Sequence, residues 1–171
     1  ADVDTHYISM NEVKEMKKGV EYTGSVVGFS FPNKGKVDCG EDGMATVKGT
    51  LPGQKVKFVV SKKRSGTPIG RLKEIVEKSE IEDVEPACPH FEFCGGCSYQ
   101  TLSYVNQLNL KKGMVKDILD NAIVGDYQFE GILGSPVQWG YRNKMEFSFG
   151  DEVKDGPLAL GMHKRNSFHD I

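Results

Sequence analysis

Short segments in the first half of the chain alternate apolar and polar residues. From Gly19 to Lys78, stretches rich in valine, threonine, phenylalanine and isoleucine are separated by residues that favour turns. Alternation with a period of two is typical of β-strands that bury one face. The pattern predicts five strands, at Glu21–Phe29, Lys36–Cys39, Met44–Lys48, Lys55–Lys62 and Pro68–Val76.

Four short breaks with turn chemistry separate the predicted strands. They lie at Pro32–Gly35, Gly40–Gly43, Leu51–Gln54 and Arg64–Thr67. Glycine, proline, asparagine and aspartate favour turns because of their backbone preferences and short side chains. Five strands within about 60 residues favour a small closed barrel of the OB type, which has no free sheet edge. An SH3-type barrel has a similar strand count, so strand count alone leaves both architectures open.

Beyond the predicted barrel the pattern becomes helical. Ser79–Pro86 is an acidic connector, and a loop with three cysteines follows it. Apolar residues then recur at helical spacing, which predicts a helix from about Ser103 to Ala122 that Gly125 terminates. These apolar residues are Val105, Leu108, Val115, Ile118, Leu119 and Ala122.

Three further strands are predicted after this helix, at Phe129–Leu133, Lys144–Phe149 and Leu158–His163. In the second of them Met145, Phe147 and Phe149 alternate with polar residues, so we expect these three side chains to point inward. The expected fold class is therefore mainly β with an α+β second part. We expect a barrel domain over 12–78, an acidic linker over 79–87 and a second domain over 88–171. A strand-like pattern that persists near the last residue indicates a truncated chain.

Charge is distributed unevenly along the chain, although the formal net charge is only −2. Residues 12–78 contain 14 lysines and arginines against 8 acidic residues, a balance of +6. Residues 79–98 contain 5 acidic residues and no basic ones. A basic module followed by an acidic connector favours a polyanionic partner for the first module alone.

The composition is that of an ordinary globular protein, with 38% apolar and 27% charged residues. Its apolar runs are a few residues long, whereas a membrane-spanning helix needs about 20. Residues 1–10 have neither the basic leader nor the apolar core of a signal peptide. We therefore expect a cytoplasmic, monomeric protein without a membrane partner.

The most informative motif is Cys88-Pro-His-Phe-Glu-Phe-Cys94-Gly-Gly-Cys97. Three cysteines within ten residues, in a chain without an export signal, favour metal binding over disulfides. Gly95 and Gly96 allow the backbone to fold closely around sulfur, where amide N–H groups can donate hydrogen bonds. Three convergent thiolates bind zinc together with a fourth ligand, or an iron–sulfur cluster.

Spacing alone does not separate these two metal centres. His90, His163 or His169 could complete a zinc site with three cysteines and one histidine. Cys39 lies in a predicted barrel strand, where a free cysteine commonly serves as a small buried apolar residue. We therefore expect Cys39 to be structural.

Several motifs together resemble those of a known enzyme family. The cysteine motif is followed by Tyr99-Gln100 and Gln107, and Leu51-Pro-Gly-Gln-Lys-Val56 is similar to the characteristic turn of the TRAM domain, an OB-like RNA-binding barrel. Tyr141-Arg-Asn-Lys144 and Gly161-Met-His-Lys-Arg165 are similar to two consecutive strands of that family's central domain. The chain from about Gly19 onward thus resembles the RNA 5-methyluridine (uracil-C5) methyltransferases, best of all their TrmA/RumA-like branch that modifies ribosomal RNA.

The resemblance implies a 4Fe-4S cluster held by Cys88, Cys94 and Cys97, with a fourth cysteine beyond Ile171. The fragment alone would then hold the cluster poorly or not at all. It also implies a C-terminal domain that binds S-adenosylmethionine, where a cysteine thiolate adds to C6 of uracil and a general base later removes the C5 proton. No glycine-rich cofactor turn and no candidate nucleophile occur in this chain. We therefore predict no catalytic and no S-adenosylmethionine-binding residue here.

Cationic and aromatic residues are candidates for RNA contacts, because cations neutralise phosphates and aromatic rings stack on unpaired bases. Phe29 and Phe31 lie near the first turn, and Lys48, Lys55 and Lys57 belong to the basic barrel. The predicted RNA-binding residues are Lys34, Lys36, Lys62, Lys63, Arg64, Arg71, Tyr141, Arg142, Asn143, Lys144, Lys164 and Arg165. The simpler reading of the barrel lysines is a solvated outer face.

The sequence departs from the family pattern at two positions. Gln54 replaces the usual acidic residue of the TRAM turn, and Asp83 stands where the connector often carries an arginine. We expect both changes to alter RNA contacts and to leave the architecture intact.

The leading hypothesis is the RNA-binding and iron–sulfur portion of an S-adenosylmethionine-dependent RNA uracil-C5 methyltransferase that acts on ribosomal or other structured RNA. A stand-alone zinc-stabilised RNA-binding module and a transfer-RNA-acting member of the same family are the alternatives. A radical-type methylthiotransferase also combines a TRAM domain with an iron–sulfur centre. Its cysteine spacing is C-x3-C-x2-C and its TRAM domain comes last, and both features differ here.

Overall fold

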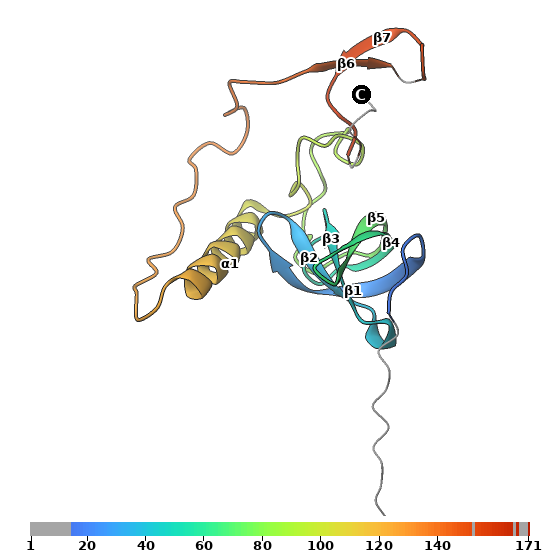
Figure 1. Ribbon diagram of the computed structural model, residues 1–171. Helices are drawn as coiled ribbons and strands as arrows, with labels where there is room; N and C mark the ends of the chain where they lie inside the picture. Colours follow the sequence, from blue (N-terminus) through green and yellow to red (C-terminus); the bar gives the residue numbers. More distant parts are fainter. Residues whose placement is uncertain (1–14, 152, 166, 168–170) are drawn as a thin grey trace, which may run out of the picture.

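The computed structural model describes residues 15–151, 153–165, 167 and 171. Its first part is a closed five-stranded barrel (Figure 1). The strands are β1 (Glu21–Ser30), β2 (Lys34–Asp38), β3 (Met44–Lys48), β4 (Lys55–Arg64) and β5 (Thr67–Glu77). The five-strand prediction is confirmed, and every strand begins and ends within about two residues of its predicted bounds, the usual uncertainty of strand ends.

The order of the strands around the barrel decides its type. The neighbours are β1-β2-β3-β5-β4, and pairing of β1 with β4 closes the barrel. All pairs are antiparallel except β3 with β5, which run parallel. This crossover order is the Greek key of an OB-type barrel, which is consistent with a TRAM domain.

Alternation along the strands builds the barrel core. In β4, Val56, Phe58 and Val60 are fully buried, whereas Lys55 and Lys57 lie on the outer face. The opposing strand β5 has a glycine where the Phe58 ring packs. A Cβ atom on Gly70 would lie 2.3 Å from Phe58 Cδ2, so only glycine leaves room for this ring.

Cys39 lies at the end of β2, directly before the 3-10 turn η1 (Gly40–Asp42), and packs against the barrel core. Burial, aided by the nearby carboxylates of Asp42 and Asp38, raises the pKa of its thiol to about 11. The thiol is therefore neutral at physiological pH. This environment suits the structural role expected for Cys39.

One helix follows the barrel, α1 (Tyr104–Ala122), as predicted. The Ser103 hydroxyl caps it by accepting a hydrogen bond from the Asn106 backbone N–H at 3.4 Å. Met114 is the buried residue of α1, and it lines a shallow hollow between α1 and β1. No helix in the described part of the chain is long and apolar enough to cross a membrane.

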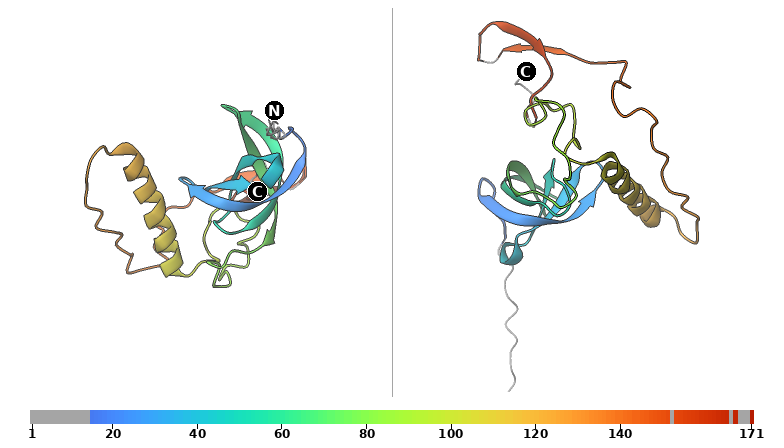
Figure 2. Two further views of the ribbon diagram at one scale, coloured as in Figure 1. Left: turned by 90° about the horizontal axis from the view of Figure 1, so that it is seen from below. Right: turned by 180° about the vertical axis from the view of Figure 1, so that it is seen from behind.

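The part of the chain after α1 differs from the prediction. Its described residues contain one antiparallel hairpin, β6 (Ser148–Asp151) and β7 (Leu158–Gly161). The strand predicted at Phe129–Leu133 is absent, and the strand predicted from Lys144 begins only at Ser148. Figures 1 and 2 show residues 123–147 as an extended segment that runs from α1 to the hairpin, away from the barrel.

The expectation that Met145, Phe147 and Phe149 point inward is wrong, because all three side chains are exposed in the structure. A strand needs a partner to satisfy its backbone hydrogen bonds, and a buried face needs a second surface. Among the described residues, no strand pairs with 123–147. The alternating pattern alone therefore does not produce a strand here.

Candidate nucleic-acid interface and cysteine loop

The outer face of β2 and β3 carries a concentration of positive charge. Lys34 pairs directly with Lys48 across the two strands, and Lys36 lies two residues further along the same face. Like charges at directly opposed positions repel each other. Among the described residues none of these lysines has an ion-pair partner, so this face favours a bound anion.

Other barrel lysines are neutralised within the fold. Lys55 pairs with Glu77 at 3.0 Å, and Lys57 pairs with Glu74 at 2.9 Å, both across β4 and β5. The ion pair raises the pKa of Lys57, first through the hydrogen bond to Glu74. The barrel therefore has two kinds of lysine, and those on β2 and β3 belong to the kind without an ion-pair partner in the described structure.

The loop between β1 and β2 borders the charged face. Phe31, in this loop, is 62% exposed and lies beside the hollow that Met114 and Ile118 of α1 also line. The ring is large, apolar and accessible, as base stacking requires. Phe29 is only partly exposed and faces the second hollow against α1, so Phe31 is the better stacking candidate of the two.

The hairpin between β4 and β5 presents a second group of cations. Lys62, Arg64 and Arg71 are exposed and, in the part of the chain that the structure describes, have no ion-pair partner. Lys63 differs, because its Nζ pairs with the Glu15 carboxylate, and this pair lowers the pKa of Glu15. In OB-type barrels the face of strands 2 and 3 and the loops 1–2 and 4–5 surround the nucleic-acid site.

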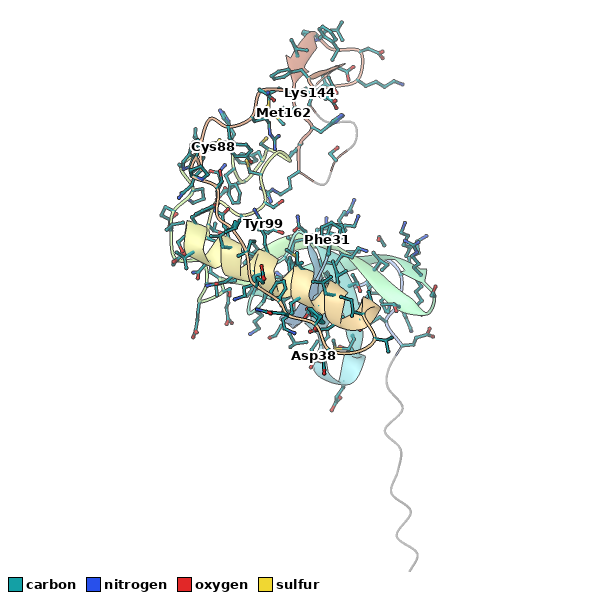
Figure 3. The ribbon with its side chains drawn as sticks, turned by 90° about the vertical axis from the view of Figure 1, so that its left-hand side faces the viewer. Phe31, Asp38, Cys88, Tyr99, Lys144 and Met162 are labelled. Carbon is teal, nitrogen blue, oxygen red and sulfur yellow. The ribbon has the colours of Figure 1, made fainter. Side chains whose placement is uncertain are left out.

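The remaining predicted RNA-binding residues lie far from this face in the chain. Residues 141–144 belong to the extended segment before β6, where Tyr141 is exposed and Lys144 pairs with Glu146 at 2.8 Å. Lys164 is exposed beside the cysteine loop. Figure 3 shows Lys144 on the opposite side of Cys88 and Tyr99 from the barrel.

The cysteine loop (residues 88–97) is held by the segment that follows β7. Cys94 forms an isolated antiparallel bridge with Lys164, the Gly95 N–H donates to the His163 carbonyl at 3.1 Å, and the Arg165 N–H donates to the Phe93 carbonyl at 2.6 Å. Cys88 donates its backbone N–H to the side-chain oxygen of Gln100. The distant segment after β7 and the neighbouring Gln100 therefore both hold the loop.

The glycines of the loop provide the close approach that their motif predicted. The Gly96 N–H donates to Cys94 Sγ at 3.3 Å, and a Cβ on Gly96 would lie 2.9 Å from Met162 Cε. Amide donors to sulfur stabilise thiolates and are a recurrent feature of metal-bound cysteines. Figure 3 shows Met162 next to the loop at Cys88.

Arg165 reaches into the cysteine loop. Its Nη2 donates to the carbonyl oxygens of Phe91 at 2.6 Å and Cys97 at 2.9 Å, and its guanidinium carbon lies 4.7 Å from the centre of the Phe91 ring. Its Nε is buried without a hydrogen-bond partner among the described residues. This arginine was predicted to contact RNA, and the structure places it inside the loop.

The three cysteines of the loop have the donor chemistry of a metal centre, but their side chains do not converge on one point. Within the described residues no three cysteine, histidine, aspartate or glutamate side chains are placed to hold one ion. Cys88 and Cys94 are partly buried, and Cys97 is exposed. The loop still offers what an anionic, sulfur-ligated group requires: three thiols, glycines that let the backbone approach sulfur, and the Arg165 Nε–H. Binding of such a group would require the three thiols to move closer together.

The histidines considered for zinc are placed differently. His90 is exposed, and the ring of His163 lies 3.2 Å from the Ser148 hydroxyl, between Nε2 and Oγ. His169 lies outside the described residues. The described structure therefore does not single out a histidine as a fourth ligand.

The two departures from the family pattern connect the barrel to the rest of the chain. The Gln54 side chain is buried, accepts from the Leu51 N–H at 2.7 Å, and donates to Glu82 Oε1 at 2.8 Å. Asp83 accepts from the Ser103 N–H at 2.6 Å, and this hydrogen bond lowers the pKa of Asp83. Both side chains make structural contacts, so the expectation that Gln54 alters RNA contacts finds no support in its burial.

A further contact joins the cysteine loop region to the barrel and was not predicted. The Tyr99 hydroxyl donates to Asn33 Oδ1, and Asn33 Nδ2 donates to the Ser98 hydroxyl at 3.2 Å. Partial burial raises the pKa of Tyr99, so the hydroxyl remains a donor at neutral pH. Asn33 is next to Pro32 in the β1–β2 loop, and no local pattern could indicate a partner so distant in the sequence.

Comparison with known proteins supports part of the family resemblance. No family model matches the chain. An uncharacterized RNA methyltransferase of Caldanaerobacter subterraneus subsp. tengcongensis is 42% identical over 156 residues, which cover 91% of this chain and 34% of that protein. An uncharacterized RNA methyltransferase of Clostridium acetobutylicum is 42% identical over 162 residues, which cover 94% of this chain and 33% of that protein.

A relative with a named activity is also similar. The 23S rRNA (uracil(1939)-C(5))-methyltransferase RlmD of Legionella pneumophila strain Paris is 33% identical over 162 residues, 92% of this chain and 35% of that enzyme. The chain spans about a third of the length of the curated relatives it matches. Over nearly all of its length, the chain is homologous to one third of an RNA methyltransferase.

Proposed function

We propose that the chain is the RNA-recognition and iron–sulfur portion of an S-adenosylmethionine-dependent RNA uracil-C5 methyltransferase that acts on ribosomal RNA. The similarity to an enzyme named for 23S rRNA uracil methylation is the observation that carries the proposal. The OB-type barrel supports it, because such barrels bind nucleic acids on the face of strands 2 and 3. Methyl transfer itself is assigned to the part of such an enzyme that this chain does not match.

The RNA site in this proposal is the outer face of β2 and β3 with the loop that precedes it. Lys34, Lys36 and Lys48 supply phosphate contacts, and Phe31 stacks on an unpaired base. Lys62, Arg64 and Arg71 extend the positive surface along β4 and β5. The proposal is supported by the exposure of these side chains, which is partial for Lys34, and by their lack of acidic partners in the described structure.

A salt titration of RNA binding tests this site. Each phosphate contact to single-stranded nucleic acid contributes about 0.7 to the slope of log K against log salt. We expect Lys34→Ala/Lys36→Ala to lower the slope by about 1.4, by this rule. The matched control is Lys55→Ala/Lys57→Ala, which removes the same charge from lysines that are already paired. Equal losses in both double variants would contradict the proposed site.

Stacking is tested separately with Phe31→Ala. Loss of one base-stacking contact costs about 1–3 kcal/mol in affinity for single-stranded nucleic acid. Phe31→Tyr keeps a stacking ring and should bind RNA nearly as well as the unchanged protein. Binding by Phe31→Ala that equals the unchanged protein would remove Phe31 from the site.

The cysteine loop completes the proposal as the ligand set of an iron–sulfur cluster. Three cysteines, an amide donor to Cys94 sulfur and the glycine cradle support this assignment. Iron and acid-labile sulfide are measured after anaerobic purification of the full-length protein. Zinc alone would favour a zinc-stabilised RNA-binding module instead.

A further inference from the structure

Arg165 is one of two adjacent cations beside the cysteine loop, and the two have different surroundings. Lys164 is exposed, whereas the Arg165 side chain donates to the Phe91 and Cys97 carbonyls and stacks on the Phe91 ring. Its main chain adds a hydrogen bond to the Phe93 carbonyl. Arg165 thus contacts the loop on both sides of Cys94.

These contacts engage one guanidinium nitrogen with the loop and bury a second one. Two of its hydrogen bonds go to carbonyl oxygens of the loop, and its Nε–H is buried rather than turned to solvent. A buried donor without an acceptor is unfavourable, and native structures rarely retain one. A bound anionic group in the loop would provide the missing acceptor.

The charge around the loop points in the same direction. Residues 79–98 carry five acidic residues and no basic ones, so their own segment supplies no lysine or arginine to balance negative charge on the sulfurs. A guanidinium brought in from the segment after β7 is the cationic group that the structure shows within the loop. Hydrogen bonds and net charge around the sulfurs set both cluster affinity and reduction potential.

We propose that Arg165 is a positioning residue of the cysteine-ligated centre, which closes the loop between Phe91 and Cys97 and supplies positive charge and an N–H donor to its sulfurs. The inference rests on the proposed iron–sulfur cluster. It replaces the RNA contact that the sequence predicted for Arg165, and it leaves that prediction in place for Lys164.

Arg165→Gln, Arg165→Lys and the control Lys164→Gln test this role in the full-length protein. The first readout is iron and acid-labile sulfide per chain after anaerobic reconstitution at limiting iron. Removal of such an outer contact weakens metal binding by about 10- to 100-fold, so Arg165→Gln should lose most of its iron. Lys164→Gln should retain the iron content of the unchanged protein.

The reduction potential of the cluster shows whether Arg165 acts through its charge or only by holding the loop in place. Removal of a positive charge disfavours the added electron, so the residual cluster of Arg165→Gln should have a more negative potential. Arg165→Lys retains the charge and should return the potential close to that of the unchanged protein, with only partial recovery of iron retention. Far-ultraviolet circular dichroism monitors the fold of all variants.

A salt titration of RNA binding tests the alternative, that Arg165 contacts a phosphate. If Arg165 contacted a phosphate, Arg165→Gln would lower the salt slope by about one while its iron content and potential matched those of Lys164→Gln. That result would overturn the inference and leave the cluster proposal standing. An unchanged protein that took up no iron and sulfide would overturn both.

Discussion

The barrel and the segment that follows α1 both place apolar side chains at alternate positions, yet only the barrel buries them. Val56, Phe58 and Val60 alternate with lysines in β4 and are fully buried. Phe147 and Phe149 alternate with polar residues in the same way and are exposed. The difference shows that alternation defines two faces of a strand, whereas burial of one face requires a second surface to cover it.

Substitution of one phenylalanine by alanine in each region is expected to give the largest difference in the free energy of unfolding. Phe58→Ala removes a fully buried ring and should lower the free energy of unfolding by about 3–5 kcal/mol. Phe149→Ala removes a ring that is 74% exposed and should change it by less than about 0.5 kcal/mol. Urea unfolding followed by circular dichroism measures both. A comparable loss for Phe149→Ala would mean that the hairpin is covered in solution.

Exchange of the polar pair that joins the barrel to the acidic connector should have an intermediate effect on stability. Gln54→Glu replaces the amide donor to Glu82 with a carboxylate, so two acceptors face each other in a buried position. A broken buried hydrogen bond of this kind costs about 1–3 kcal/mol. The double variant Gln54→Glu/Glu82→Gln reverses the donor and the acceptor and should recover most of that loss. A double variant as unstable as Gln54→Glu would show that the pair is not coupled.

The smallest effect is expected from pH and concerns the barrel alone. The pKa of Cys39 is raised from 9.0 to about 11, so the folded state retains a proton that the unfolded chain releases. The resulting stability is complete below pH 9 and is lost as pH rises through about 11. We expect a loss below about 1 kcal/mol, because water screens this partly exposed thiol. Cys39→Ala should flatten the alkaline part of a pH–stability profile, and an unchanged slope would contradict the assignment.

Much of the barrel could be predicted from local pattern. The turn residues and the alternation in β4 and β5 place the strands correctly, because each strand buries a face that its own sequence marks. The Ser103 cap and the spacing of apolar residues likewise define α1. The cysteine motif also identified the loop and its close-packed glycines, since these depend on residues next to each other in the chain.

The contacts of individual polar residues could not be predicted from the sequence. Gln54 was noted as a departure from the family turn and Arg165 was expected to contact RNA, and in the structure their side chains are bound to Glu82 and to the Phe91 and Cys97 carbonyls. The strand predicted at Phe129–Leu133 failed for a related reason, because no described strand pairs with it. In each case the outcome depends on a partner that is distant in the chain.

The sequence by itself determined which segments of the barrel form strands, where α1 begins, and which loop carries the three closely spaced cysteines. The tertiary structure decided the crossover order that makes the barrel OB-type and the position of Arg165 within the cysteine loop. It also decided which lysines lack acidic partners among the residues that the structure describes. The division has one physical reason. Backbone preference and alternation act between neighbours in the chain, whereas burial, ion pairing and hydrogen bonding depend on residues that only folding brings together.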